Sequence, residues 1–150
     1  MPITRNSEQG SVGLEAFYQE IATEEAQQYG SPDKALGGGH SMLRLLARVN
    51  ELFPRTQLWG LTSLYCLVVQ NVDDWRADWL IRIWSGLDGT FYFEYLLPAV
   101  ARPWPDATVR GEPSSLADAE RYLLIAMREC QGWKGNTELE ALLSSYGLDC

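Results

Sequence analysis

The chain contains little of the residue types from which most metal and acid–base sites are built. Its 150 residues include one histidine, His40, and three cysteines, Cys66, Cys130 and Cys150. Cysteine and histidine are the main ligands of zinc, and a zinc site here would need all four residues to converge. The cysteines also lack C-x-x-C spacing. We therefore expect free thiols in a reducing compartment, with no disulfide, no metal and no cofactor.

The lone histidine does not stand in a recognisable catalytic pattern. It follows the run Gly37–Gly39 and precedes Ser41. Adjacent residues rarely present their side chains to each other, and no third residue that would orient the pair is identifiable. The glycines precede the histidine, whereas the oxyanion motif of esterases has the reverse order, and no G-x-S-x-G elbow exists. The segment is better explained as a flexible joint before a helix that Ser41 caps.

Long hydrophobic runs and an excess of positive charge are also absent. No apolar run approaches the ~20 residues of a membrane-spanning helix. The opening MPITRNSEQG lacks the basic and then apolar layout of a signal peptide. The chain has 12 basic and 20 acidic side chains, so its formal net charge is −8. This charge repels nucleic acid and anionic membranes and favours a basic protein partner, and we expect a cytoplasmic protein.

Aromatic and β-branched residues, by contrast, are plentiful between Asp78 and Pro98. Two alternating runs flank the glycine-containing segment Gly86–Gly89, which is a strong signal of a β-hairpin. Because bulky aromatic residues are mostly buried in small domains, we expect four of them to lie in the core. These are Trp79, Trp84, Phe91 and Phe93.

One charged residue interrupts each strand of this hairpin, Arg82 in the first and Glu94 in the second. Their distances from the turn put them on neighbouring rungs, which predicts a cross-strand ion pair on the less buried face. The alternative is a hydrolase that uses carboxylates around Glu94. A glycosidase-like site would need a second carboxylate about 5–10 Å away across a cleft, and the sequence does not place one.

The rest of the chain supplies helices before and after this hairpin. Leu58–Val69 is apolar on both sides of a period of two, which predicts a single central strand covered on both faces. Thr108–Arg110 is a short edge strand. Helical spacing marks the ranges 14–29, 42–53, 115–132 and 137–147, with Ser115 and Asp118 as a capping pattern and Gly132 as a C-cap. These elements predict one α+β domain over 1–150, with helices on an antiparallel sheet of three to four strands.

Three tryptophans stand apart from the apolar runs. Trp75, Trp104 and Trp133 lie among polar, proline or glycine residues. A tryptophan in an exposed loop beside acids is a strong interface anchor, although such residues also fold back as lids on a core. The acids of the first loop do not have the spacing of a calcium loop. The residues that we expect to bind a partner are Asp73, Asp74, Trp75 and Asp78 before the hairpin, and Trp104, Asp106 and Glu112 after it.

The layout from about residue 56 to residue 134 is similar to that of a known class of proteins. It consists of WLIRIWS from Trp79, a glycine turn, FYFEYLLP from Phe91, the short VRG from Val109, and the helix from Ser115 that ends in Gly-Trp. This layout resembles the small immunity proteins that bacteria pair with secreted toxins, as in polymorphic, contact-dependent and type VI secretion toxin systems.

The resemblance implies a non-enzymatic inhibitor in the cytoplasm that covers the active site of a cognate toxin. Such toxins often have basic active-site clefts. An acidic surface with tryptophan anchors would mimic a polyanionic substrate and speed encounter. A chaperone or adaptor for a secreted effector would also be small, acidic and non-enzymatic, and it stays open as the alternative, with the hydrolase third.

Overall fold

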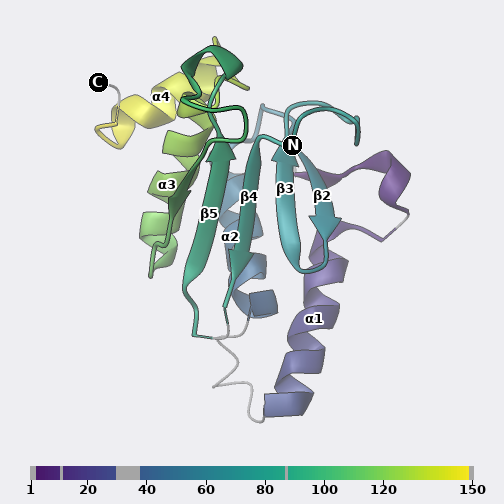
Figure 1. Ribbon diagram of the computed structural model, residues 1–150. Coiled ribbons are helices and arrows are strands. Elements are labelled where there is room, and N and C mark those ends of the chain that lie inside the picture. Colours follow the sequence, from purple (N-terminus) through teal and green to yellow (C-terminus); the bar gives the residue numbers. More distant parts are fainter. Residues whose placement is uncertain (1–2, 11, 30–37, 87, 149–150) are drawn as a thin grey trace.

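The computed structural model describes residues 3–10, 12–29, 38–86 and 88–148. Helices precede and follow a series of strands, with one very short strand ahead of the first helix (Figure 1). The elements in chain order are β1 (Thr4–Arg5), the 3₁₀ helix η1 (Ser7–Gln9), α1 (Leu14–Tyr29), α2 (Gly38–Leu52), β2 (Trp59–Ser63), β3 (Cys66–Gln70), β4 (Ile81–Ser85), β5 (Phe91–Leu96), the 3₁₀ helix η3 (Ala99–Ala101), β6 (Thr108–Gly111), α3 (Leu116–Glu129) and α4 (Thr137–Ser145).

The strands form one sheet in the order β1-β2-β3-β4-β5-β6. β1 runs parallel to β2, and each later pair is antiparallel. The α+β class is confirmed, but the sheet has six strands where the sequence predicted three to four. One extra strand is β1, whose two residues are too few to show a period. The other arises because the expected strand Leu58–Val69 is a hairpin.

The prediction of a single strand over Leu58–Val69 is wrong because the chain reverses at Leu64. Ser63 pairs with Cys66, so only two residues form the turn between β2 and β3. Leu64, the first of them, has a φ of 55°, the sign that a type II′ turn requires at that position. Turns of this type normally carry glycine there, and the absence of glycine leaves the hairpin without its usual sequence signal.

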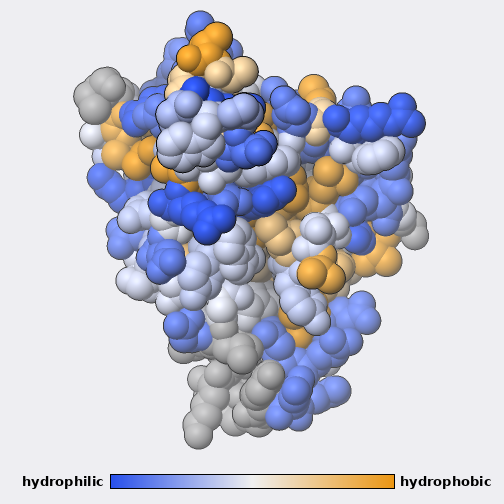
Figure 2. All heavy atoms as spheres, viewed as in Figure 1, coloured by the Kyte–Doolittle hydropathy of each residue, from blue (hydrophilic) through white to orange (hydrophobic). Residues whose placement is uncertain are grey.

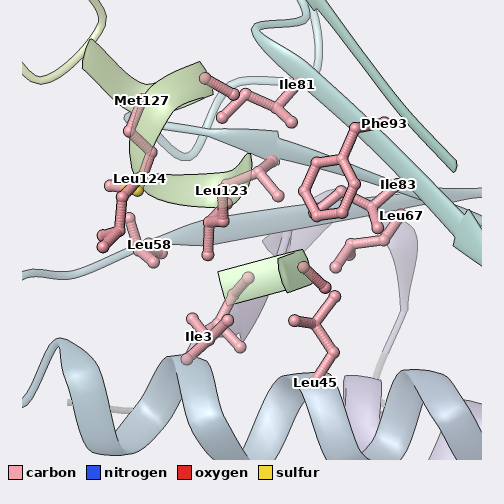
Figure 3. Packing of buried hydrophobic residues seen from close by; sticks show 14 of the residues in the cluster. Ile3, Leu45, Leu58, Leu67, Ile81, Ile83, Phe93, Leu123, Leu124 and Met127 are labelled. Atoms are coloured by element: carbon pink, nitrogen blue, oxygen red, sulfur yellow. The ribbon is translucent and has the colours of Figure 1, made fainter. Parts of the chain in front are cut away.

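Helices α2 and α3 pack on one face of the sheet, and α1 packs against α2 (Figure 1). Alternate strand residues point into this layer, and Figure 3 shows Leu67, Ile83 and Phe93 of the sheet near Leu45 of α2 and Leu123 of α3. None of the described helices covers the opposite face. Leu67, Val68, Val69 and Gln70 are nevertheless all buried, so the expectation of a central strand covered on both faces is confirmed for β3, although the second cover is not a helix, and it fails for β2. Within the described residues, no helix has the length and apolarity needed to cross a membrane.

Helix α1 confirms the predicted range, and α2 begins earlier than predicted. Gly38 and Gly39 belong to α2 rather than to a flexible joint, and Gly37 lies outside the described residues. Ser41 lies inside the helix and is buried, so it is not the cap. The first amides of α2 instead donate to the Glu25 carboxylate of α1, from Gly38 N at 3.2 Å and from Gly39 N at 2.8 Å. A side chain from a neighbouring helix therefore caps α2.

The start of α3 is as predicted, and its end is not. Ser115 Oγ accepts from Asp118 N at 3.1 Å, which confirms the capping pattern. The residue that takes the left-handed conformation after the helix is Gln131, with a φ of 64°, and not Gly132. Gly132 serves a different purpose, because a Cβ there would lie 2.5 Å from Cδ1 of Leu80. The glycine permits close approach of two segments.

Helix α4 has a capping residue at each end. Asn136 accepts from Leu139 N at 2.8 Å and satisfies the first turn. Gly147 has a φ of 70°, and Leu148 N donates to Leu143 O at 2.7 Å. This is the Schellman arrangement, and it confirms that Gly147 terminates the helix, whose last residue is Ser145.

Candidate partner-binding surface

The face of the sheet away from the helices carries a row of side chains that changes character from strand to strand. Strand pairing places Leu61, Val68, Arg82, Glu94 and Arg110 side by side across β2 to β6. The row is apolar on β2 and β3 and charged on β4 to β6. Figure 2 shows the same division, with hydrophobic surface over β2 and β3 and hydrophilic surface over β5. We call this surface the open face.

The charged half of the row is a cluster around Glu94, of which 5% is exposed. Oε1 of Glu94 accepts from Nη1 of Arg82 at 3.2 Å, and Oε2 accepts from Nε of Arg110 at 2.7 Å and from Oγ1 of Thr108 at 3.3 Å. The predicted Arg82–Glu94 ion pair is confirmed, with the two residues directly opposite each other. Arg110 was not predicted as a partner of Glu94, because its position depends on how β6 pairs with β5.

Two tryptophans that were expected in the core lie on the open face. Trp84 follows Arg82 by two residues, so a period of two puts it on the same face, where it stacks on Tyr92 with ring centroids 5.6 Å apart. Trp79 precedes β4, and the guanidinium of Arg82 lies 3.9 Å from the centre of its ring. Both tryptophans are half-buried. Phe91 and Phe93 are buried against the helices as predicted.

The open face is hollowed into a groove of about 740 Å³ over β2, β3 and β4. Its floor is the apolar half of the row, with the Arg82–Glu94 pair along one side. Aromatic and apolar side chains from two loops and from β4 form its ends. The lining residues that matter most are Leu61, Leu64, Cys66, Val68, Gln70, Trp75, Trp79 and Trp84.

Gln70 connects the groove to the loop between β3 and β4. Its side chain is buried, with 1% of the residue exposed. Nε2 donates to the carbonyl oxygens of Asp74 and Ala77, each at 3.2 Å. These two bonds hold the loop segment that carries Trp75 at one end of the groove. Oε1 of Gln70 has no hydrogen-bond partner among the described residues.

The loop residues that were predicted to bind a partner lie mostly at one end of the sheet. The loop between β3 and β4 and the loop between β5 and β6 lie at the same end of the strands. Both loops therefore project there, at the top of Figure 1. Trp75 is 53% exposed and Trp104 65%. The residues at this end are Asp73, Asp74, Trp75, Asp78, Trp104 and Asp106. Glu112 is separate, because it follows β6 at the other end of that strand.

Two of these carboxylates have local structural partners. Asp73 accepts from Ser7 N at 2.9 Å, which ties the loop to the N-terminal segment. Asp74 accepts from Arg76 N at 2.9 Å within its own loop. Trp133, the third loop tryptophan of the sequence analysis, is buried in the core and does not join this surface.

The remaining candidate groups do not form a second site. His40 is exposed on α2. Cys66 and Cys130 are free thiols, and burial raises the pKa of each; Cys150 lies outside the described residues. Among the described side chains, no group of three or more His, Cys, Asp and Glu is arranged to hold a metal ion. The chain therefore presents a sheet with one open, tryptophan-bearing face.

Comparison of this chain with models of protein families, with the sequences of characterised proteins and with solved structures finds no match.

Proposed function

We propose that the chain is a cytoplasmic immunity protein that binds and neutralises a cognate secreted bacterial toxin. The observation that carries the proposal is the end of the sheet where Trp75 and Trp104 are exposed among carboxylates. Large apolar side chains rarely stand in water without a partner when they gather at one place. Tryptophans inside a polar rim are the usual anchors of protein interfaces.

The charge of the chain supports a basic partner. A formal net charge of −8 gives an attractive field to a toxin with a basic active-site cleft. Asp73, Asp74, Asp78 and Asp106 stand beside the two exposed tryptophans and would meet that cleft as the phosphates of a substrate do. The carboxylates would speed association, and the tryptophans would slow release. Inhibition would follow because the bound protein covers the active site, and it requires no catalysis by this chain.

The groove on the open face supports a second candidate function. A chaperone or adaptor for a secreted effector needs an exposed apolar groove that holds a segment of its client, and the groove lined by Leu61, Leu64 and Trp75 offers one. The hydrolase alternative has less support, because both oxygens of Glu94 are held by Arg82, Arg110 and Thr108. A general base needs access to the proton that it removes.

Capture and rescue experiments test the proposal together. Tagged protein isolated from the native host should recover one dominant protein partner, and expression of this chain should protect cells from the toxicity of that partner. Absence of protection would contradict the immunity function. Native mass spectrometry with truncated forms of the partner separates the two candidates, since an inhibitor requires the folded toxin domain and a chaperone requires only an unfolded or non-catalytic segment.

A further inference from the structure

We propose that the groove on the open face is a docking site for a protein segment with an apolar side chain between basic residues. The inference rests on the proposed function, namely that the chain binds a protein, and it adds a second contact surface beyond the exposed loops. The apolar side chain would lie on the floor of the groove, and its basic neighbours would lie near the acidic loop at the end of the sheet.

The lining of the groove fits an apolar side chain. Leu61, Val68 and Cys66 form a floor without formal charge, and Trp75 and Trp84 stand at its two ends. The charged groups along its side are already paired, Arg82 with Glu94. A side chain that entered the groove would therefore displace water from apolar atoms without having to compensate a bare charge.

Gln70 holds the shape of the groove at its Trp75 end. Only 1% of Gln70 is exposed, and the residue lines the groove. Its amide nitrogen donates to two carbonyl oxygens, so the nitrogen and oxygen of this side chain are not interchangeable. The oxygen is buried and finds no hydrogen-bond partner in the part of the chain that the structure describes.

Leu64 marks the other end of the groove as a contact surface. Its φ of 55° is a left-handed conformation that costs a leucine energy, and 89% of the residue is exposed. Glycine would fit the turn better, and a polar residue would fit the solvent better. A partner that packs on the leucine would cover its apolar side chain and so offset the cost of the left-handed conformation. Its neighbour Tyr65 is also exposed and also lines the groove.

The charge around the groove selects the flanking residues of the segment. The groove lining is neutral in sum, because Arg82 and Glu94 cancel. The loop at its Trp75 end carries Asp73, Asp74 and Asp78, all of them exposed, against one exposed cation, Arg76, which lies over the Trp75 ring. Lysine or arginine beside the apolar side chain would be attracted there, whereas acidic neighbours would be repelled.

A short peptide tests the groove without knowledge of the toxin. The probe is Ac-Gly-Lys-Leu-Lys-Gly-NH2, titrated into the ¹⁵N-labelled full chain at low salt and followed by NMR. We expect shifts of the indole N–H signals of Trp75 and Trp84 and of the side-chain amide of Gln70. A peptide with serine in place of leucine, and one with glutamates in place of the lysines, should each bind about tenfold more weakly. Equal binding of all three peptides, or no shift at these groups, would overturn the proposal.

Matched variants test whether Leu64 and Trp75 take part in peptide binding. Leu64→Gly should stabilise the fold and weaken peptide binding several-fold. Gln131→Gly relieves the same kind of backbone strain at the end of α3, so it should stabilise the fold and leave binding unchanged. Trp75→Ala should weaken peptide binding, and Trp104→Ala, outside the groove, should not. If Leu64→Gly and Gln131→Gly behave alike, Leu64 has no part in docking.

The outcomes distinguish this inference from the proposed function. Peptide binding at the groove together with absence of rescue from the toxin would uphold the docking site and reject the immunity function. If rescue and toxin binding survive Trp75→Ala and Leu64→Gly but are lost in Trp104→Ala, the immunity function is upheld and the docking site is rejected. In that case the toxin would bind the loop that carries Trp104 and not the groove.

Discussion

The side chain of Gln9 binds the backbone of Thr62 as a neighbouring strand would. Its Nε2 donates to Thr62 O at 2.8 Å, and its Oε1 accepts from Thr62 N at 2.6 Å. β1 pairs with β2 only as far as Gly60, so the backbone beyond that residue would be an open edge. Open edges invite pairing with other chains. One carboxamide thus closes the edge of the sheet beside the open face.

Gln9→Ala should lower the free energy of unfolding and expose this edge. Loss of both hydrogen bonds leaves the N–H and C=O of Thr62 to water, and we expect a cost of about 1–2 kcal/mol. Urea unfolding measures the loss, and sedimentation velocity should show self-association that grows with concentration. Gln27→Ala, at an exposed position on α1, is the control and should change neither quantity. Equal effects of the two variants would show that Gln9 does not protect the edge.

Gly39→Ala should disrupt the packing of α1 on α2. A Cβ at Gly39 would lie 2.5 Å from Ala22 N and 2.9 Å from Tyr18 O, and both atoms belong to helical backbone that cannot rotate away. The helices would have to separate, at a cost of about 1–3 kcal/mol or more. Thermal and urea unfolding measure it. Gly13→Ser adds a side chain where, apart from its chain neighbours, no atom of the described residues lies within 4 Å, so it should leave stability unchanged or slightly higher and serves as the control.

The two arginines that flank Glu94 should contribute unequally to stability. The Arg110 side chain is 77% exposed, so Arg110→Ala should cost about 1 kcal/mol or less. Arg82→Ala removes both the pair with the buried carboxylate and the stacking on Trp79, and should cost about 1–3 kcal/mol. Urea unfolding at low and high salt compares them. A larger cost for Arg110→Ala would contradict this account of the cluster.

The buried thiols should make the fold less stable at alkaline pH. Burial raises the pKa of Cys66 and of Cys130, so the folded chain holds these protons more tightly than the unfolded chain. The contribution to stability is complete below the ordinary thiol pKa of about 8.5 and is lost as the pH rises through the raised folded values. We expect the free energy of unfolding to fall above that pH. The double variant Cys66→Ala with Cys130→Ala should show a shallower fall, and an unchanged slope would contradict the prediction.

The acidic loop should govern the rate of association with the toxin. Asp73→Lys with Asp74→Lys reverses charge beside Trp75 and should slow association by about tenfold at low salt, with a smaller effect at high salt. Stopped-flow fluorescence measures the rate. Glu20→Lys with Glu24→Lys makes the same charge change on exposed positions of α1 and should slow association less. Equal slowing by the two variants would show that net charge, and not this loop, steers the encounter.

Patterns within one element were predicted well, and relations between elements were not. The range of α1, the cap at Ser115 and the alternation of Phe91 and Phe93 follow from neighbours along the chain. Leu64 was missed because the turn has no glycine, and Trp84 was placed in the core because its size outweighed its period. The register that brings Arg110 to Glu94 depends on how β6 pairs with β5, which a short edge strand does not disclose.

The sequence by itself determined the α+β class, the central hairpin, the acidic charge and the Arg82–Glu94 pair, because period, turn residues and composition act locally. Only the tertiary structure decided which face of the sheet the helices cover. Burial depends on where α2 and α3 pack, and from that choice follow the groove, the buried side chain of Gln70 and the exposed Leu64. The one face left without a helix is where the chain has apolar surface to offer a partner.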